Sequence, residues 1–94
     1  MNLEWLPLAI EDFNEIIDSI AEDNPAAAIE QGDEIESQIA GLTVNRLMGR
    51  NGRVKGTREL VVVRTPYIVA YRIKKNDILI LRVLHGARNW PDRF

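Results

Sequence analysis

The chain has 94 residues, of which 46% are hydrophobic and 28% are charged, and it contains no cysteine. This composition predicts one globular domain spanning residues 1–94 rather than a disordered chain. The lack of cysteine excludes disulfides and thiol chemistry, and one histidine cannot build a His/Cys metal site. We therefore expect no metal, no other cofactor, no membrane span and a cytoplasmic location.

The net charge of −2 is a cancellation between two parts of the chain. Residues 1–44 hold eleven of the 14 acids and no Lys or Arg, whereas residues 45–94 hold all 12 basic residues. A basic segment this concentrated indicates an anionic partner.

The first half of the chain predicts a short strand and a helical hairpin. Residues 2–6 can form the strand, and Pro7 suits the first position of a helix. Asn24 and Pro25 are typical of the N-cap and first position of a second helix, in which Gly32 permits close approach. Apolar residues recur at helical spacing in both segments, at Ile10, Phe13, Ile16, Ile17 and Ile20 and then at Ile29, Ile35, Ile39 and Leu42. Most of the acids then face water.

The second half predicts a loop and three strands. Residues 45–56 are rich in Asn, Gly and Arg and show no period, which indicates a loop. The segments Thr57–Arg64, Tyr67–Lys74 and Asp77–Leu84 are rich in β-branched residues and indicate an antiparallel meander. The first strand must join this sheet, at a position that the sequence leaves open. The fold class is therefore α+β, in the order β-α-α-β-β-β.

Strand alternation assigns the side chains to two faces of this sheet. An unpaired arginine in a core is very costly, so we turn four arginines away from the helices: Arg58, Arg64, Arg72 and Arg82. The same alternation then leaves an apolar patch on the open face, made of Leu60, Val62, Ile68, Ile80 and Leu84. Such a patch rimmed by arginines marks a binding surface, unless a loop or the C-terminal tail covers it.

Three smaller features carry possible chemistry. The segment Gly49–Gly56 contains glycines and bases but matches no nucleotide-binding motif, so it is either a phosphate-binding loop or a mobile surface loop. His85, three residues before Arg88, could act as a general acid or base on a phosphodiester, or could pack locally at a strand end. Trp90 either anchors the tail on the core or stacks on a base.

The order of these elements resembles the RelE/ParE superfamily of bacterial toxins. The resemblance rests on Gly49-Arg50, on Gly56-Thr57-Arg58-Glu59-Leu60-Val61-Val62, on Pro66-Tyr67-Ile68-Val69-Ala70-Tyr71-Arg72 and on the ending Ile80-Leu81-Arg82-Val83-Leu84-His85-Gly86-Ala87-Arg88-Asn89-Trp90-Pro91. Asn24-Pro25-Ala26-Ala27 between the helices also fits. The resemblance covers essentially the whole chain.

The resemblance implies the toxin of a type II toxin–antitoxin pair, neutralised by an antitoxin that wraps an extended segment around it. The open face would bind this antitoxin through Arg58, Leu60, Val62, Arg64, Ile68, Arg72, Ile80 and Arg82. Operator DNA would be reached only through the antitoxin.

The superfamily divides over its targets, and the motifs here are closer to the ParE-like members, which poison DNA gyrase. The target would contact His85, Arg88 and Trp90, without chemistry by the toxin itself. The alternative is a RelE-like endoribonuclease that cleaves mRNA on the ribosome with Arg64, His85 and Arg88. This cluster is incomplete, since Ile68 replaces an arginine of some nucleases and the chain ends in Phe94 rather than Tyr. A third possibility is an inactive toxin that acts mainly as operon co-repressor.

Overall fold

The computed structural model describes all residues from Met1 to Phe94. The chain begins with strand β1 (Asn2–Trp5) and continues into helices α1 (Pro7–Asp23) and α2 (Pro25–Ala40). The 3-10 turn η1 (Gly41–Thr43) follows. The remaining strands are β2 (Arg50–Asn51), β3 (Arg58–Val61), β4 (Tyr67–Lys74) and β5 (Asp77–His85). The predicted α+β fold is thus confirmed, with an additional two-residue strand in the segment predicted as a loop.

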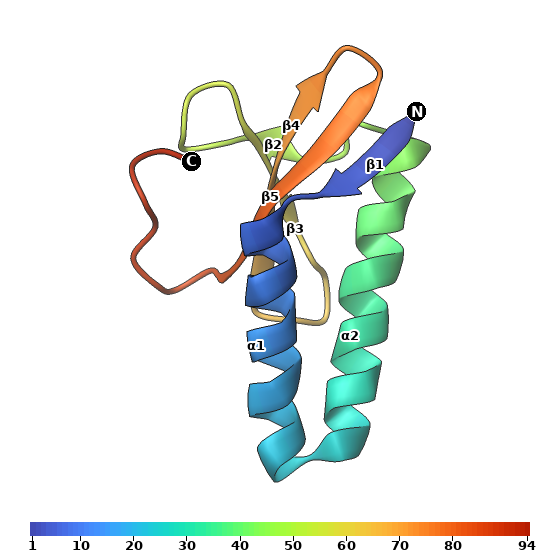
Figure 1. Cartoon of the computed structure of the whole chain (residues 1–94), viewed down its shortest axis with the longest axis vertical. Helices are drawn as coiled ribbons and strands as arrows, with labels where there is room; N and C mark the ends of the chain where they lie inside the picture. The colour runs from blue at the N-terminus through green and yellow to red at the C-terminus, as the bar shows by residue number, and fades with distance from the viewer.

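The two helices form the predicted hairpin (Figure 1). Asn24 is the N-cap of α2, where its side-chain oxygen accepts a hydrogen bond from the N–H of Ala27 at 3.1 Å. A Cβ on Gly32 would lie 3.1 Å from Ile17 Cδ1, a tight contact, so glycine at this position permits the close approach to α1. Two apolar residues assigned to the packed faces, Ile10 and Ile29, are instead 46% and 67% exposed.

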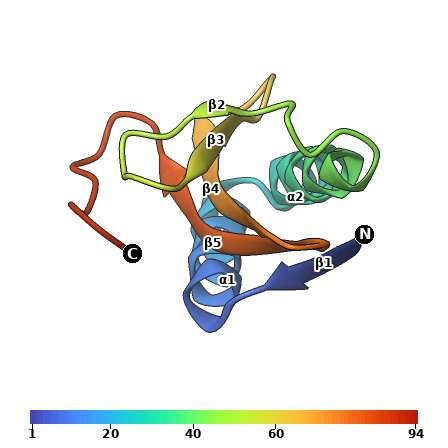
Figure 2. The same cartoon turned by 90° about the horizontal axis from the view of Figure 1, so that it is seen from above.

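The sheet has five strands in the order β1-β5-β4-β3-β2. Strands β3, β4 and β5 form the predicted antiparallel meander, and β2 extends it antiparallel to β3. Strand β1, whose place the sequence left open, pairs parallel with β5 and forms the other edge. Figure 2 shows the strong twist of this sheet and the loop after β2 and the C-terminal tail on the side away from α2.

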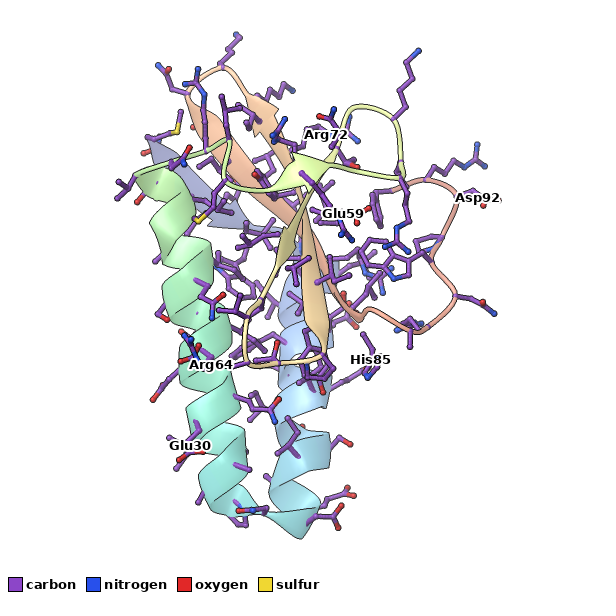
Figure 3. The ribbon with its side chains drawn as sticks, turned by 180° about the vertical axis from the view of Figure 1, so that it is seen from behind. Glu30, Glu59, Arg64, Arg72, His85 and Asp92 are labelled. Carbon is purple, nitrogen blue, oxygen red and sulfur yellow. The ribbon has the colours of Figure 1, made fainter.

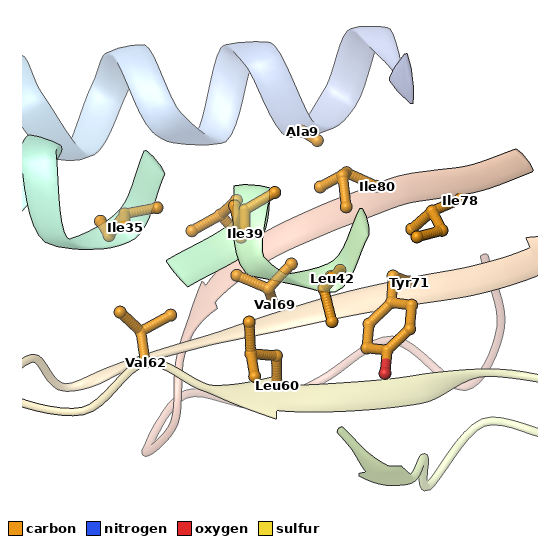
Figure 4. Packing of buried hydrophobic residues seen from close by; sticks show 11 residues of the cluster. Ala9, Ile35, Ile39, Leu42, Leu60, Val62, Val69, Tyr71, Ile78 and Ile80 are labelled. Atoms are coloured by element: carbon orange, nitrogen blue, oxygen red, sulfur yellow. The ribbon is translucent and has the colours of Figure 1, made fainter. Parts of the chain in front are cut away.

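The main core lies between the helices and one face of the sheet (Figure 4). It contains eleven buried residues, and the helical hairpin with η1 contributes Ala9, Ile35, Ile39 and Leu42. The sheet side contributes Leu60, Val62, Val69, Tyr71, Ile78, Ile80 and Val83. The prediction that Leu60, Val62 and Ile80 lie on an open face is therefore wrong.

An irregularity in β5 explains part of this error. Ala70 pairs with Arg82 and the next residue, Tyr71, pairs with Ile80, so Leu81 is an extra residue in β5. A bulge of this kind interrupts the alternation, and both Ile80 and Val83 then reach the same core. A strictly alternating strand cannot place these two side chains on one face.

The opposite face of the sheet is also covered. Outside the main cluster, the buried apolar residues of β4 and β5 are Ile68, Ala70, Leu81 and Leu84. Gly86, the first residue after β5, packs against one of them, since a Cβ on Gly86 would lie 3.1 Å from Ile68 Cδ1. Ile68 and Leu84 are therefore buried, and the prediction that they form part of an open patch is wrong.

Candidate functional site

A buried carboxylate orders the loop after β2, which crosses the face of the sheet opposite the helices. Glu59 is only 3% exposed and accepts hydrogen bonds from Arg50 Nη2 at 3.1 Å, from Arg53 Nε at 3.0 Å and from the Arg53 backbone N–H at 2.8 Å. Desolvation raises the pKa of Glu59, but these hydrogen bonds outweigh it, so its pKa lies below the ordinary value. Glu59 therefore stays ionised and fixes two arginines.

The tail is attached to this loop through an aromatic contact. The guanidinium of Arg53 lies 3.8 Å from the ring centroid of Trp90, a cation–π geometry. The indole Nε1 of Trp90 is buried without a hydrogen-bond partner. This placement favours the anchoring role for Trp90 over base stacking.

Arg58 forms hydrogen bonds with β2 and with the segment that precedes it. Its Nε donates to the Gly49 carbonyl at 3.1 Å, and its terminal nitrogens donate to the Leu47 carbonyl at 3.3 Å and to Asn51 Oδ1 at 3.2 Å. Gly49 is packed so tightly that a Cβ would lie 2.7 Å from the Glu59 carbonyl oxygen. Arg58 thus has a structural role, and its donors are not free for an antitoxin.

Arg82 is likewise engaged inside the protein. Its Nε and Nη2 donate to the two carboxylate oxygens of Asp12 on α1 at 2.7 and 2.9 Å, and the N–H of Val83 donates to the same carboxylate at 3.0 Å. The bidentate pair with Asp12 raises the pKa of Arg82. This pair fastens α1 to β5, so Arg82 does not rim an open patch as predicted.

An exposed apolar groove runs instead along the free edge of β3. Strand β2 pairs only with Arg58 and Glu59, so β3 has no strand neighbour beside Val61. Three large apolar side chains are exposed here: Met48 (46%), Val61 (45%) and Val63 (52%). We call this surface the β3 groove; it is lined by Gln38, Met48, Arg50, Glu59, Leu60, Val61, Val63 and Arg64.

The end of the β3 groove is closed by α2. The side-chain amide of Gln38 donates to the Val63 carbonyl at 3.0 Å and accepts from the Val63 N–H at 2.9 Å, as a neighbouring strand would. Arg64 has a positive φ of 68° and pairs with Glu34 at 2.7 Å. Hydrogen bonds from Arg64 hold the pKa of Glu34 below its ordinary value. Of the predicted antitoxin-binding residues, Arg64 therefore lies beside an open surface.

The sequence reasoning missed Met48, Val61 and Val63. The alternation of residues 60–63 was predicted correctly, but Leu60 and Val62 were assigned to the open face in place of Val61 and Val63. The reason is that Arg58 and Arg64, which were turned away from the helices, alternate in step with Leu60 and Val62. Both arginines find polar partners within the protein, Arg58 at the Leu47 carbonyl and Arg64 at Glu34 on α2. The available signal was the run of valines at 61–63, since strand alternation places Val61 and Val63 on the face opposite to Val62.

A second, polar groove lies where β5 ends. It has a volume of about 320 Å³ and is lined by Asp12, Glu15, Ile16, Ser19, Tyr67, Val83, His85 and Arg88. His85 is exposed, its Nδ1 accepts from the N–H of Ala87 at 3.1 Å, and its ring meets Tyr67 edge-on at 5.8 Å. Burial raises the pKa of the Tyr67 hydroxyl.

The proposed nuclease residues are only partly brought together. His85 and Arg88 share the polar groove, but Arg64 lies against α2, beside a different pocket (Figure 3). The carboxylate of Glu15 lines the same groove as His85, which disfavours a bound phosphate there. No group of three or more metal-ligating side chains lies together, and neither helix is long and apolar enough to cross a bilayer.

The comparisons with known proteins agree with this architecture. Residues 3–90 match the family described as ParE toxin of type II toxin-antitoxin system, parDE. The Y4kP protein of Sinorhizobium fredii (strain NBRC 101917 / NGR234) is 38% identical over 89 residues, which are 95% of this chain and 92% of that protein. A structure of the chromosomal ParDE toxin–antitoxin system from P. aeruginosa superposes with a TM-score of 0.80 at 31% identity, covering 88% of this chain and 92% of that one. The chain thus belongs to the ParE toxin family of type II toxin–antitoxin systems.

Proposed function

We propose that a cognate antitoxin neutralises this toxin by laying an extended segment along the β3 groove. The observation that carries the proposal is the exposed row Met48, Val61 and Val63 beside a strand that has no neighbour there. An exposed strand edge is a template for another chain, and apolar pockets beside it select alternate side chains.

The chemistry of the groove defines the segment that would fit. Apolar side chains at alternate positions would cover Val61 and Val63. An acidic residue near the end of the segment would meet Arg64, which already binds the carboxylate of Glu34. Arg50, whose side chain is 57% exposed, offers a second cation at the other end of the groove.

Substitutions in the groove test this arrangement. Val61→Lys and Met48→Lys alter exposed side chains, so the fold should persist, while antitoxin affinity should fall by about 30-fold or more, the loss expected for a hot-spot residue. Val44→Lys is the matched control, because Val44 is 91% exposed and lies outside the groove. Affinities equal to wild type for both groove variants in calorimetric titration would place the antitoxin elsewhere.

We further propose that the free toxin inhibits DNA gyrase rather than cleaving RNA. Membership in the ParE family supports this target. The separation of Arg64 from His85 and Arg88 argues against a nuclease site, because cleavage requires several groups that converge on one phosphate. His85, Arg88 and Trp90 then remain candidates for contact with the target.

Induction of the toxin without antitoxin distinguishes these activities. We expect loss of negative supercoiling and accumulation of gyrase–DNA cleavage complexes, with unchanged transcript 5′ ends. Codon-positioned transcript cuts with normal DNA topology would establish the ribonuclease instead. Normal growth with neither signal would support the inactive co-repressor.

A further inference from the structure

The split of charge along the sequence becomes a split along the long axis of the molecule. The molecule extends 39 Å along this axis. Glu30 lies on the helical hairpin toward one end, and Arg72 lies at the far end of the sheet (Figure 3). Other acids near the turn between the helices are Asp18, Glu22, Asp23 and Asp33.

Four cations gather at the far end of the sheet, and we call them the hairpin cluster: Lys55, Arg72, Lys74 and Lys75. Arg72 and Lys74 alternate along β4 and so share a face. Arg72 Nη1 lies 3.3 Å from the position of a Cβ on Gly56, the residue that follows Lys55 in the loop. Lys75 forms the β4–β5 turn with a φ of 56°.

The hairpin cluster is not neutralised within the protein. The four ion pairs of the structure use Arg50, Arg53, Arg64 and Arg82. The acids that the strand pairing brings near the cluster are Asp77, opposite Lys74 in the hairpin, and Glu4, which shares a cross-strand row with Arg72 through Leu79. Neither of these acids takes part in the four ion pairs. Three of the four cations, Lys55, Lys74 and Lys75, are exposed.

The surroundings of the cluster favour a phosphate backbone over a protein partner. The exposed large apolar side chain that the contacts place beside the cluster is Met1, since the N–H of Asn2 donates to the Asn76 carbonyl at 3.1 Å. One such side chain is fewer than the set of apolar anchors typical of protein interfaces. The nearby aromatic side chain, Tyr71, is fully buried, which leaves no ring on which an unpaired base could stack. Exposed lysines with a partly exposed arginine are the usual phosphate contacts of duplex DNA.

We propose that the hairpin cluster binds the phosphate backbone of duplex DNA directly, without sequence preference. This contact goes beyond the proposed inhibition of gyrase and beyond an expectation of DNA contact only through the antitoxin. The acidic end of the hairpin does not prevent it, because the molecule is 39 Å long and the Debye length at physiological salt is only about 8 Å.

Fluorescence anisotropy with a labelled duplex of about 20 base pairs tests the proposal on the purified protein. Four phosphate contacts give a slope of about −3.6 in log K against log salt, so affinity should fall on the order of 100-fold between about 50 and 200 mM salt. In the variant Lys74→Gln/Lys75→Asn the slope should halve to about −1.8, and affinity should fall about tenfold or more. Asn is chosen at position 75 because it tolerates positive φ.

The matched control is Arg93→Gln with Asn14→Asp, two exposed positions outside the cluster that produce the same net charge as the double variant. This control should keep the affinity and slope of wild type. An equal loss in both variants would show that only net charge matters and would overturn the proposal. So would the absence of duplex binding at low salt, or displacement of the duplex by polyglutamate at equal charge concentration, which would indicate an acidic protein as the partner.

Discussion

The two faces of the sheet are buried by different means. One face packs against α1, α2 and η1 through eleven apolar residues. The other is covered by the loop after β2 and by the tail, which are attached through the buried Glu59 and through Arg53 on Trp90. Apolar packing involves no titrating group, whereas the polar attachment depends on charge and therefore on pH. The face that packs on the helices is therefore stabilised by its apolar core, and the opposite face depends on a few specific polar contacts.

Truncation of one buried side chain on each face should give the largest difference in stability between the two faces. Ile80→Ala on the helix face should lower the free energy of unfolding by about 3–4 kcal/mol, because rigid helices cannot fill the cavity. Leu84→Ala on the loop face should cost about 2 kcal/mol, since the loop and tail can relax into the space. Urea unfolding measures both, and an equal loss would show that the two faces are equally rigid.

Removal of the buried charge should loosen the loop face selectively. Glu59→Gln leaves two arginines without their carboxylate and should cost about 2 kcal/mol. In a Trp5→Phe background, Trp90 is the remaining tryptophan, and its emission should shift to the red as the tail detaches. Glu30→Gln is the control, because Glu30 is exposed and unpaired. An unchanged Trp90 emission would refute the link from Glu59 to the tail.

Low pH should weaken the same face of the sheet, the one that Glu59 stabilises. The folded-state pKa of Glu59 lies below the ordinary value of 4.5, so its stabilisation is complete above that pH and is lost as the pH falls through the folded-state value. We expect wild type to lose stability over this range and Glu59→Gln to lose less. Urea midpoints measured across the range test this, and parallel curves for the two proteins would contradict it.

The tail contact should give the smallest effect. Trp90→Ala removes the ring beneath Arg53 and should cost about 1 kcal/mol. Phe94→Ala in the same tail should cost less, because Phe94 is 38% exposed. Thermal unfolding of both variants makes the comparison, and a larger loss for Phe94→Ala would move the anchor to the chain end.

Local patterns predicted most of the secondary structure. Pro7, Asn24 and Pro25 marked the helix boundaries correctly because caps and fixed φ values act within a few residues. The three long strands were found from their composition. Strand β2 was missed because two residues carry no periodic signal, and β1 could not be placed because its parallel pairing joins opposite ends of the chain.

The binding surface was harder to predict. Arginines were taken as markers of the open face, yet Arg82 has a partner seventy residues away in sequence, Asp12, and Arg58 binds nearby carbonyls. Neither partner is visible in strand alternation, so Val62 and Ile80 were assigned outward and Val61 and Val63 were overlooked.

The sequence by itself determined the order of elements, the helical hairpin and the segregation of acids from bases, because these depend on local propensity and composition. Only the tertiary structure decided which apolar residues are exposed and which cations remain free. A bulge at Leu81 reverses the alternation within β5, and the ion pair with Asp12, which is distant in sequence, holds Arg82 inside the protein. Both effects arise from contacts between residues far apart in the chain, which no local pattern specifies.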